Sequence, residues 1–466
     1  MHTSPDEHNN FSIDRFESML KTNNVLFFDS EEFEDIVNYY LENGKIALAK
    51  KATKLGLEQH PSSTNLKLYQ IEIFIFEDKL EKAEGLLDDI FLLEQSNSEI
   101  FIQKANILSR RNKHKEAIET LEKALELDHT PSDVLSLIGM EYLFMEDYEN
   151  GMQYFMKCLE EDEEDYSALY NIIYCLEFLG KSDDAINFLN DFLEKQPYCE
   201  VAWHEIAKQY RQRKEYDKAL SAIDFAIISD DTFLGAYFEK AKILEKVKRY
   251  HEAIECYSIT LTIDDPTSFA LLRIGKCHER LGNNELALEF YSKSIKEDNL
   301  RDQAWIAIID LHYKNKQYNK ALYYIEKAIA IDSTNVHYWK RYAKTNNKIN
   351  HFEEAEVGYR KALELGNYEL SSWLTRGDIL TNLGEYEAAI NNFNQAMEFY
   401  PSHPEIEYRL SGLYFSMKQS DKGEYHLNNA LKTEPEFVMI IEEIFPHVYR
   451  MKKVKQIIAQ HKNPSL

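Results

Sequence analysis

The sequence predicts an all-helical protein built from stacked helix hairpins. Three observations indicate this: tryptophans that fall in one phase, a small residue that recurs at the same spacing, and a shortage of helix-breaking residues. The gaps between the four tryptophans, Trp203, Trp305, Trp339 and Trp373, are 102, 34 and 34, and 102 is three times 34. The 466 residues include only 10 prolines and 15 glycines, and long helices tolerate few of either. A fixed period of this length is typical of repeat arrays.

The period can be followed through most of the chain. Cutting the sequence at this period from Ser30 gives twelve blocks that end at Phe437, with no insertion or deletion. Position 4 of a block is large, and it holds all four tryptophans. Position 20 is the most regular, and it reads Ala49, Ala83, Ala117, Gly151, Ala185, Ala219, Ala253, Ala287, Ala321, Ala355, Ala389 and Gly423.

Each block has the pattern of two helices joined by a tight turn. Positions 4, 7, 8 and 11 share one face of a first helix, and positions 20, 24, 27 and 28 share one face of a second. Small residues at positions 8, 20 and 27 let the helices approach closely beneath larger side chains. Glycine recurs at position 15, between the helices, as Gly44, Gly180, Gly282 and Gly384. One hairpin cannot cover its own apolar faces, so each must pack against the next.

These positions resemble the tetratricopeptide repeat family. The shared features are the large residue at 4, the small residue at 8, tyrosine at 11 (as in Tyr40 and Tyr210), alanine at 20 and 27, and proline at 32 (as in Pro197 and Pro401). The match covers 408 of the 466 residues. It implies an all-α, right-handed superhelical solenoid of about 12 hairpins with terminal capping helices. The second block departs from the pattern, with Lys67 at position 4.

The predicted domain organisation follows from the repeat. Residues 30–437 form the twelve 34-residue units, residues 1–29 a polar tail with an N-terminal capping helix, and residues 438–466 C-terminal capping helices. Within the first segment, residues 1–10 are polar enough to be disordered, and residues 12–28 can form a helix opened by Ser12. Near the C-terminus we expect a helix pair broken near Pro446. Terminal repeats need such a polar outer side.

Charge and composition exclude several classes of partner. The formal net charge is −26, which disfavours nucleic acid and membrane surfaces. The N-terminus has no secretion signal, and no apolar run is long enough to span a bilayer. The five scattered cysteines form no CxxC pair and favour a reducing compartment. We therefore expect a cytoplasmic protein.

No motif in the sequence indicates catalysis. Phosphate-binding loops and zinc or nucleophile motifs are absent, and only 29 residues flank the array on each side, too few for a catalytic domain. The acidic run from Glu160 to Asp165 lacks the glycine and the spacing of a calcium loop, and we expect a solvated turn there. The expectation is a protein that is not an enzyme and needs no cofactor or metal; a small-molecule ligand is not expected.

The resemblance implies that positions 2, 5, 9, 12 and 13 of each block line the inner wall of the solenoid. In blocks 2 to 5 these positions are largely apolar or aromatic, which marks an interaction surface. Packing against the neighbouring helix is the alternative explanation. The aromatic candidates for partner binding are Phe144, Tyr170, Tyr174 and Phe178.

In blocks 6 to 10 the same positions carry ten basic residues and only three acidic ones. The candidates singled out there are Lys208, Arg211, Lys242, Lys276, Lys340 and Lys344, with Asp310 interrupting the series at position 9. The basic stretch can bind an acidic segment of a partner. Alternatively, it only solvates the wall or balances nearby acids.

The function expected from the sequence is that of a scaffold or adaptor, with a protein or peptide that carries acidic and apolar stretches bound along the inner wall. One alternative is a regulatory subunit of a separate enzyme, which the same surface would serve. A third is a helical-repeat RNA binder, against which the strict 34-residue period and the acidic charge both argue.

Overall fold

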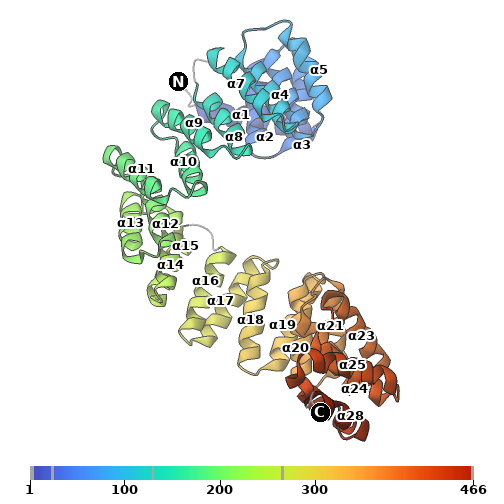
Figure 1. Ribbon diagram of the computed structural model, residues 1–466. Helices are drawn as coiled ribbons and strands as arrows, with labels where there is room; N and C mark the ends of the chain where they lie inside the picture. The colour runs from blue at the N-terminus through green and yellow to red at the C-terminus, as the bar shows by residue number, and fades with distance from the viewer. Residues whose placement is uncertain (1–4, 23–25, 128–130, 264–266, 463–466) are drawn as a thin grey trace. The chain divides into compact units, whose positions relative to one another are not determined.

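The computed structural model describes residues 5–22, 26–127, 131–263 and 267–462. Every regular element within these ranges is a helix. Contacts divide the chain into two compact units, Met1–Asp231 and Thr232–Leu466. The predicted all-helical hairpin solenoid is confirmed, and Figure 1 shows the helices in chain order.

Each unit contains six helix hairpins, and their helices begin at the predicted period. The first unit contains α2 (Ser30–Glu42), α3 (Ile46–Gln59), α4 (Thr64–Phe76), α5 (Leu80–Phe91), α6 (Ser98–Arg110), α7 (His114–Leu127), α8 (Ser132–Phe144), α9 (Tyr148–Glu161), α10 (Tyr166–Phe178), α11 (Ser182–Lys195), α12 (Glu200–Gln212) and α13 (Tyr216–Ser229). The second contains α14 (Leu234–Lys246), α15 (Tyr250–Ile263), α16 (Ser268–Arg280), α17 (Asn284–Glu297), α18 (Asp302–Lys314), α19 (Tyr318–Ile331), α20 (Val336–Lys348), α21 (Phe352–Glu364), α22 (Leu370–Asn382), α23 (Tyr386–Phe399), α24 (Pro404–Ser416) and α25 (Ser420–Thr433).

The turn inside each hairpin has the same backbone conformation throughout. The residue at position 15 has positive φ in every hairpin, from Gly44 (66°) to Lys418 (62°). The N–H of position 16 donates to the carbonyl of position 11, as from Arg249 to Leu244 at 2.9 Å. The N–H of position 15 donates to the carbonyl of position 12. These two bonds define a Schellman cap, which satisfies the last carbonyls of the first helix.

Small residues bring the two helices of a hairpin into close contact. All twelve residues at position 20 are buried, and Ala253 and Ala321 have no exposed surface. At position 8, Gly275 lies under the ring of Tyr291, and a Cβ built on the glycine would come within 2.6 Å of that ring. The predicted small-under-large packing is therefore present in the structure.

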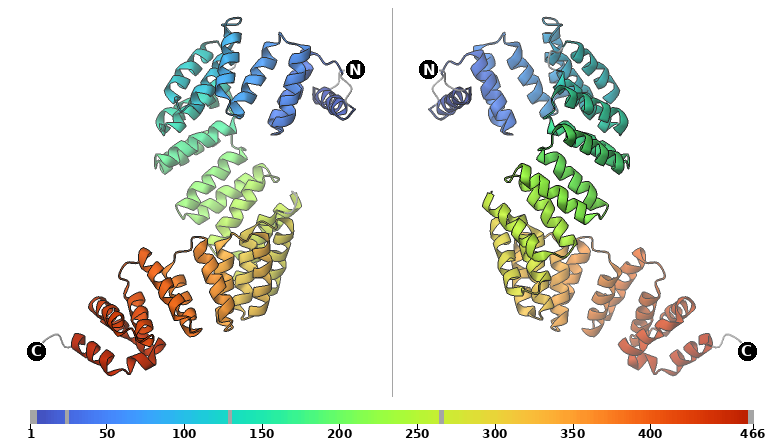
Figure 2. Two further views of the ribbon diagram at one scale, coloured as in Figure 1. Left: turned by 90° about the vertical axis from the view of Figure 1, so that its right-hand side faces the viewer. Right: turned by 90° about the vertical axis from the view of Figure 1, so that its left-hand side faces the viewer.

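Neighbouring hairpins pack through both of their helices. The second helix of one hairpin contacts the first helix of the next, as α3 contacts α4 and α15 contacts α16. First helices also contact each other directly, as α2 with α4, α4 with α6, and α16 with α18. Figure 2 shows the hairpins stacked side by side within each unit. Within each unit, the first helices therefore lie along one side of the stack, and their outward-facing positions make up its wall.

The two ends of the chain are covered by capping helices. At the N-terminus, α1 (Pro5–Thr22) packs Phe16 and Met19 against Phe33 and Tyr40. The prediction that this helix starts at Ser12 and that residues 1–10 are disordered is wrong for residues 5–10, which are helical. Proline suits the first position of a helix because its missing N–H needs no partner there, so the helix can begin at Pro5. Residues 1–4 and 23–25 of the predicted segments lie outside the described residues.

The C-terminal cap is more divided than the predicted helix pair. It consists of a 3-10 turn (η1, Pro435–Val438), α26 (Met439–Ile444), α27 (Pro446–Tyr449) and α28 (Lys452–Lys462). The break at Pro446 occurs as predicted, and proline then serves as the first residue of α27. Ile441, Phe445 and Val454 from these segments pack in one core with Leu427 of α25.

Candidate protein-binding surface

A cavity of the first unit, with a volume of about 980 Å³, is a groove along the ends of consecutive first helices. We call it the inner groove. Among its lining residues are Leu41 of α2, Ile75 and Phe76 of α4, Ser109 of α6 and Phe144 of α8. These residues occupy positions 12 and 13 of four successive hairpins. Equivalent wall positions, far apart in sequence, therefore gather around one space.

The four aromatic candidates are all solvent-accessible. Phe144 and Phe178 are 57% and 58% exposed, and Tyr170 and Tyr174 are 40% and 43% exposed. Packing against the neighbouring helix therefore does not bury these side chains. Such exposure of aromatic rings is unfavourable in water unless a partner covers them.

The structure divides these four residues into smaller groups. Tyr174 and Phe178 lie on successive turns of α10, and their ring centroids are 4.5 Å apart. Phe144 lies in the inner groove beside His114, with ring centroids 5.6 Å apart. Partial desolvation, together with the Glu205 carboxylate, raises the pKa of the Tyr170 phenol to about 12.

Sequence reasoning missed Tyr148, which belongs to the same aromatic group. Tyr148 begins α9, and its ring stacks on Phe178 at 5.0 Å and meets Tyr174 at 6.3 Å. An aromatic residue recurs at this position 17 in several hairpins, for example as Tyr216 and Tyr318. Because an aromatic residue at this position is explained by packing within the repeat, the pattern does not indicate that Tyr148 contacts Tyr174 and Phe178.

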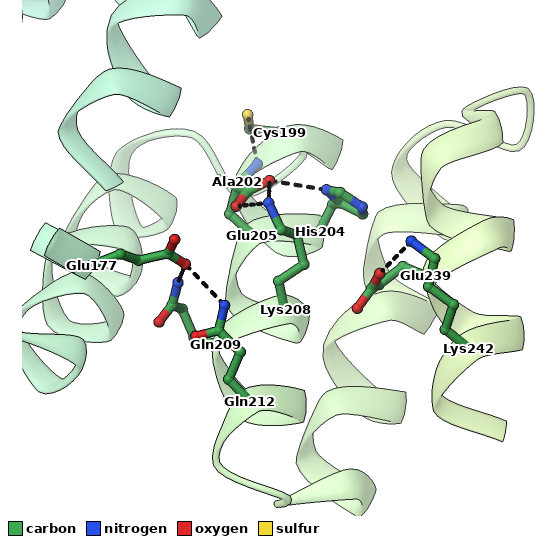
Figure 3. Close-up of polar contacts among 10 residues, drawn as sticks. All are labelled: Glu177, Cys199, Ala202, His204, Glu205, Lys208, Gln209, Gln212, Glu239 and Lys242. Carbon is green, nitrogen blue, oxygen red and sulfur yellow. Dashed lines mark hydrogen bonds and ion pairs between the residues drawn. The ribbon is translucent and has the colours of Figure 1, made fainter. Parts of the chain in front are cut away.

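In the first unit, the basic candidate Lys208 is paired with a buried acid. Its Nζ donates to both carboxylate oxygens of Glu205, at 2.9 and 2.7 Å, and Glu205 is 1% exposed (Figure 3). His204 also meets this carboxylate, at 3.2 Å. Burial raises the pKa of Glu205, but the bonds to His204 and Lys208 outweigh it, and the pKa is lowered. Arg211 is half-buried one turn further along α12.

The neighbouring polar contacts of α12 fix the wall to the previous hairpin. Glu177 of α10 accepts from the amide nitrogens of Gln209, at 2.6 Å, and Gln212, at 3.1 Å (Figure 3). Because Gln209 is fully buried, this bond anchors α12 against α10.

In the second unit, Lys242 repeats the arrangement of Lys208. Its Nζ lies 3.4 Å from the carboxylate of Glu239, which is 2% exposed (Figure 3). Lys276 differs, because Arg273 takes the place of the acid three residues earlier. Lys276 forms no ion pair with any residue that the structure describes. Partial burial and the Arg273 charge lower its pKa, although Glu245 and Glu279 oppose the shift.

The remaining basic candidates have different partners. Lys340 forms an ion pair with Glu369, and Lys344 lies 5.2 Å from the ring centroid of Tyr313. Asp310, which interrupts the lysine series, accepts two bonds of 2.7 Å from Arg341 in the next hairpin. Local acids therefore balance part of the basic wall, while Lys276 and Lys344 have no carboxylate partner within the described chain.

Other sequence features have ordinary structural roles. The acidic run ends α9 and forms an exposed turn, in which Asp165 caps α10 by accepting from the N–H of Ala168 at 2.9 Å. All five cysteines are buried and free, and burial raises the pKa of Cys158 to about 11. The described residues contain no group of three side chains placed to hold a metal ion. Within the same ranges, no helix is both long and apolar enough to cross a bilayer.

Comparison with known families identifies repeats at several places along the chain. Two models described as tetratricopeptide repeat match it. One matches residues 98–130, 132–165, 234–258 and 370–403, and the other matches residues 167–197 and 269–298. These segments coincide with whole or partial hairpins in the register seen in the structure.

Among curated proteins, subunit 2-A of the ER membrane protein complex of Xenopus laevis is 29% identical over 97 residues, which make up 21% of this chain and 33% of that protein. Subunit 3 of the anaphase-promoting complex of Schizosaccharomyces pombe is 29% identical over 136 residues, 29% of this chain and 20% of that protein. The chain thus spans a third or less of the length of these two relatives.

Among solved structures, the C-terminal part of a TPR repeat-containing protein from Cytophaga hutchinsonii has a TM-score of 0.44 and 16% identity, covering 51% of this chain and 98% of that one.

Proposed function

The chain belongs to the tetratricopeptide repeat family, and on this premise we propose that it is a scaffold or adaptor that binds a segment of another protein along the wall of its first helices. The observation that carries the proposal is the inner groove with its exposed aromatic rings. Phe76 is 62% exposed and Phe144 is 57% exposed within one groove of about 980 Å³. Glu72, Arg110 and Glu141 also line this groove, and large apolar side chains beside a few polar groups are the usual form of a peptide-binding surface.

The proposed partner segment is apolar where it meets the first unit and acidic where it meets the basic wall. The apolar part contacts Phe144, Tyr170, Tyr174 and Phe178. The acidic part contacts Lys208, Arg211, Lys242, Lys276, Lys340 and Lys344. Within this set, Lys276 and Lys344 carry most of the attraction, because Lys208 and Lys242 already neutralise Glu205 and Glu239. Charges of one sign on such a wall accelerate encounter with an opposite charge.

An alternative is that the chain is a regulatory subunit that positions a separate enzyme. Two relatives are named as subunits of larger complexes, which favours membership of an assembly in either case. We propose further that the protein is not itself an enzyme and works in the cytoplasm, where buried free thiols such as Cys175 remain reduced.

The proposal is tested by the kinetics of partner binding. The protein is captured on a surface, and a partner purified with it from the native cell is passed over it at two salt concentrations. The Lys276→Glu and Lys344→Glu double variant should associate about tenfold more slowly than the parent at low salt, because steering depends on charge. The matched control is the Lys248→Glu and Lys316→Glu double variant, which makes the same change of charge in two hairpin turns away from the wall positions.

The outcomes separate the alternatives. Unchanged association of the double variant at both salt concentrations would mean that the lysines only solvate the wall. If the purified partner is an enzyme whose activity changes on binding, the regulatory subunit is the correct description. Retention on single-stranded RNA at moderate salt would instead support the RNA-binding alternative.

A further inference from the structure

A second cavity in the first unit is lined by three carboxylates that lack a basic partner. We call it the acidic pocket. It has a volume of about 320 Å³, and its lining residues are Glu34 of α2, Asn65, Leu68, Tyr69 and Glu72 of α4, and Glu99 and Gln103 of α6. Glu34, Glu72 and Glu99 occupy wall positions 5, 9 and 2 of three successive hairpins. No Lys, Arg or His in the part of the chain that the structure describes forms an ion pair with any of the three.

The hydrogen bonds in this pocket leave it rich in acceptors. Glu34 accepts from Ser30 at 3.0 Å, from Ser63 at 3.4 Å and from Asn65 at 2.9 Å. Glu99 accepts from Nε2 of Gln103 at 2.7 Å. Glu72 receives no hydrogen bond from any side chain within the described ranges. Neutral donors to Glu34 and Glu99 do not cancel three negative charges.

Gln103 supplies an independent sign that the pocket accepts a ligand. Its side chain is 5% exposed, and its Oε1 is buried without a hydrogen-bond partner in the described structure. The orientation of this amide is fixed, since an ionised Glu99 can only accept and must therefore face Nε2. A buried acceptor without a donor is costly, because the oxygen has lost its hydrogen bonds to water. Because Gln103 lines the pocket, a donor bound there is the group that would satisfy this oxygen once the side chain turns toward it.

The electrostatics of the pocket point in the same direction. Although Glu72 reaches solvent, partial desolvation by the surrounding wall raises its pKa, and the Glu99 carboxylate raises it further. Burial, with Glu34 and Glu72 nearby, raises the pKa of Tyr69 to about 12, so its hydroxyl stays neutral. Negative charge is thus concentrated in this pocket without compensation, and a cation is the complementary ligand.

We propose that the acidic pocket binds the guanidinium group of an arginine from a partner protein segment. Guanidinium presents five donors and no acceptor in a rigid fork, which suits two carboxylates and the Oε1 of Gln103 together. An ammonium group has only three donors on one atom. The inference rests on the proposed function, since it adds a charged subsite to the wall that binds a partner.

The position of the pocket determines which residues flank this arginine. Glu72 lines both the acidic pocket and the inner groove, so the two cavities adjoin. The inner groove continues past Ile75 and Phe76 toward Phe144. A segment with its arginine at Glu72 therefore has apolar side chains next to it along the chain. This part of the partner is basic and apolar, in contrast to the acidic part proposed for the lysine wall.

The test uses the full chain and a small probe, without a partner. N-acetyl-arginine amide is titrated into protein with isotope-labelled leucine methyl groups, and the signal of Leu68 reports on the pocket. The expected result is a saturable shift of Leu68 with no shift of Leu413, which is buried in the second unit. N-acetyl-citrulline amide, a neutral analogue of the same shape, should bind at least about tenfold more weakly.

Two variants examine the carboxylate and the amide separately. Glu72→Gln has no partner to lose and should fold normally, and it should weaken binding of the arginine probe about tenfold. Gln103→Met keeps the size of the side chain but removes the acceptor, together with the Nε2 donor to Glu99, and it should also weaken binding. No Leu68 shift, or equal binding of the citrulline analogue, would overturn the proposal, as would an unchanged affinity in both variants.

A third probe identifies the source of the guanidinium. A short peptide in which arginine is followed by leucine and phenylalanine should bind more tightly than N-acetyl-arginine amide, and Phe144→Ser should remove only this gain. If free agmatine binds as tightly as the peptide, a protein segment is not the ligand. Since the reporter is Leu68 and no partner is present, failure of this test leaves the partner kinetics described above unaffected.

Discussion

Gly377 of α22 lies directly beneath the aromatic ring of Phe393 of α23, so that a Cβ built on the glycine would come within 2.1 Å of the ring Cζ. The same pairing of position 8 with position 24 occurs at Gly139 and Phe155, where the distance would be 2.7 Å. In these hairpins the ring fills the volume that a side chain on the first helix would need. The two helices of these hairpins can therefore approach this closely only because the glycine at position 8 has no side-chain methyl group.

Replacing Gly377 with alanine should destabilise the protein by about 1–3 kcal/mol, because the buried ring of Phe393 must move in a packed core. The free energy of unfolding from urea titration measures the change. Gly85→Ala is the matched control: this glycine lies exposed within α5, and a Cβ there would meet nothing within 4 Å. The control should gain about 0.5–1 kcal/mol, since alanine favours helix. Equal effects of the two changes would show that ring packing does not set the helix distance.

Ala253 and Ala321 mark the other close contact inside a hairpin, at position 20. Both are fully buried, and leucine at either site should overpack it and cost about 1–3 kcal/mol. Because each hairpin contacts only its neighbours, the loss should be confined to adjacent hairpins. Hydrogen exchange of backbone amides would detect this local loss of protection. If both variants unfold at the wild-type temperature and exchange their amide protons at wild-type rates, the tight packing at position 20 is contradicted.

The turn residue at position 15 predicts a gain in stability. Lys248 has a φ of 64°, a left-handed conformation that costs a residue with a Cβ about 1–2 kcal/mol. Lys248→Gly should therefore stabilise the protein, by about 0.5–1 kcal/mol after the extra freedom of glycine in the unfolded chain is counted. The reverse change, Gly282→Ala at a φ of 82°, should destabilise it by about 1 kcal/mol. Thermal unfolding of both variants measures the two opposite shifts.

Acid should weaken the structure around Glu205. Because the pKa of Glu205 is lowered in the folded state, folding favours its ionised form, and this stabilisation is fully present above the ordinary pKa of about 4.3. It is lost as the pH falls through the lowered folded pKa. Urea titrations of the parent and of Glu205→Gln should show the gap between them narrowing from pH 7 to pH 3. A constant gap would mean that the carboxylate is not stabilised by Lys208 and His204.

The aromatic group on α10 predicts a kinetic effect that differs from that of the lysines. Tyr174→Ala removes an exposed ring that lies 4.5 Å from Phe178, and it should mainly speed dissociation of the partner by removing an anchor. Association should change little, because no charge is altered. Tyr425→Ala removes an exposed ring in α25, away from the proposed surface, and should leave both rates unchanged. The measurement is partner binding kinetics on captured protein.

The fold was predictable because its determinants repeat at one spacing. Ala253 and its equivalents at position 20 sit where helices touch, and a single sequence shows this twelve times. The left-handed turn was foreseeable only in part. Glycine at Gly44 and Gly180 indicates it, but Lys214 and Lys248 adopt the same conformation without any sign in their residue type. At these two lysines, the packing of the two helices outweighs the preference of a residue with a Cβ for negative φ.

The binding surface was less predictable, because its charges are balanced between residues that the pattern does not link. The repeat pattern predicts that Lys208 lies on the wall, while Glu205, three residues earlier, occupies a position that the pattern does not place there. Its burial at 1% exposure depends on the packing of α10 and α12. The acidic pocket combines Glu34, Glu72 and Glu99 from three hairpins. No single block contains more than one of them, so the pattern within a block does not indicate the pocket.

The nearest-neighbour packing of the hairpins has a consequence for how the chain acquires its structure during synthesis. Side-chain hydrogen bonds between described residues join positions no more than 35 apart, as between Gln212 and Glu177. Contacts this close in sequence close short loops, and proteins dominated by them fold fast. As the ribosome releases the chain, each hairpin can pack onto the one before it without waiting for distant segments. The N-terminal hairpins can therefore be native, with the acidic pocket complete once α6 has emerged, while later hairpins are still being translated.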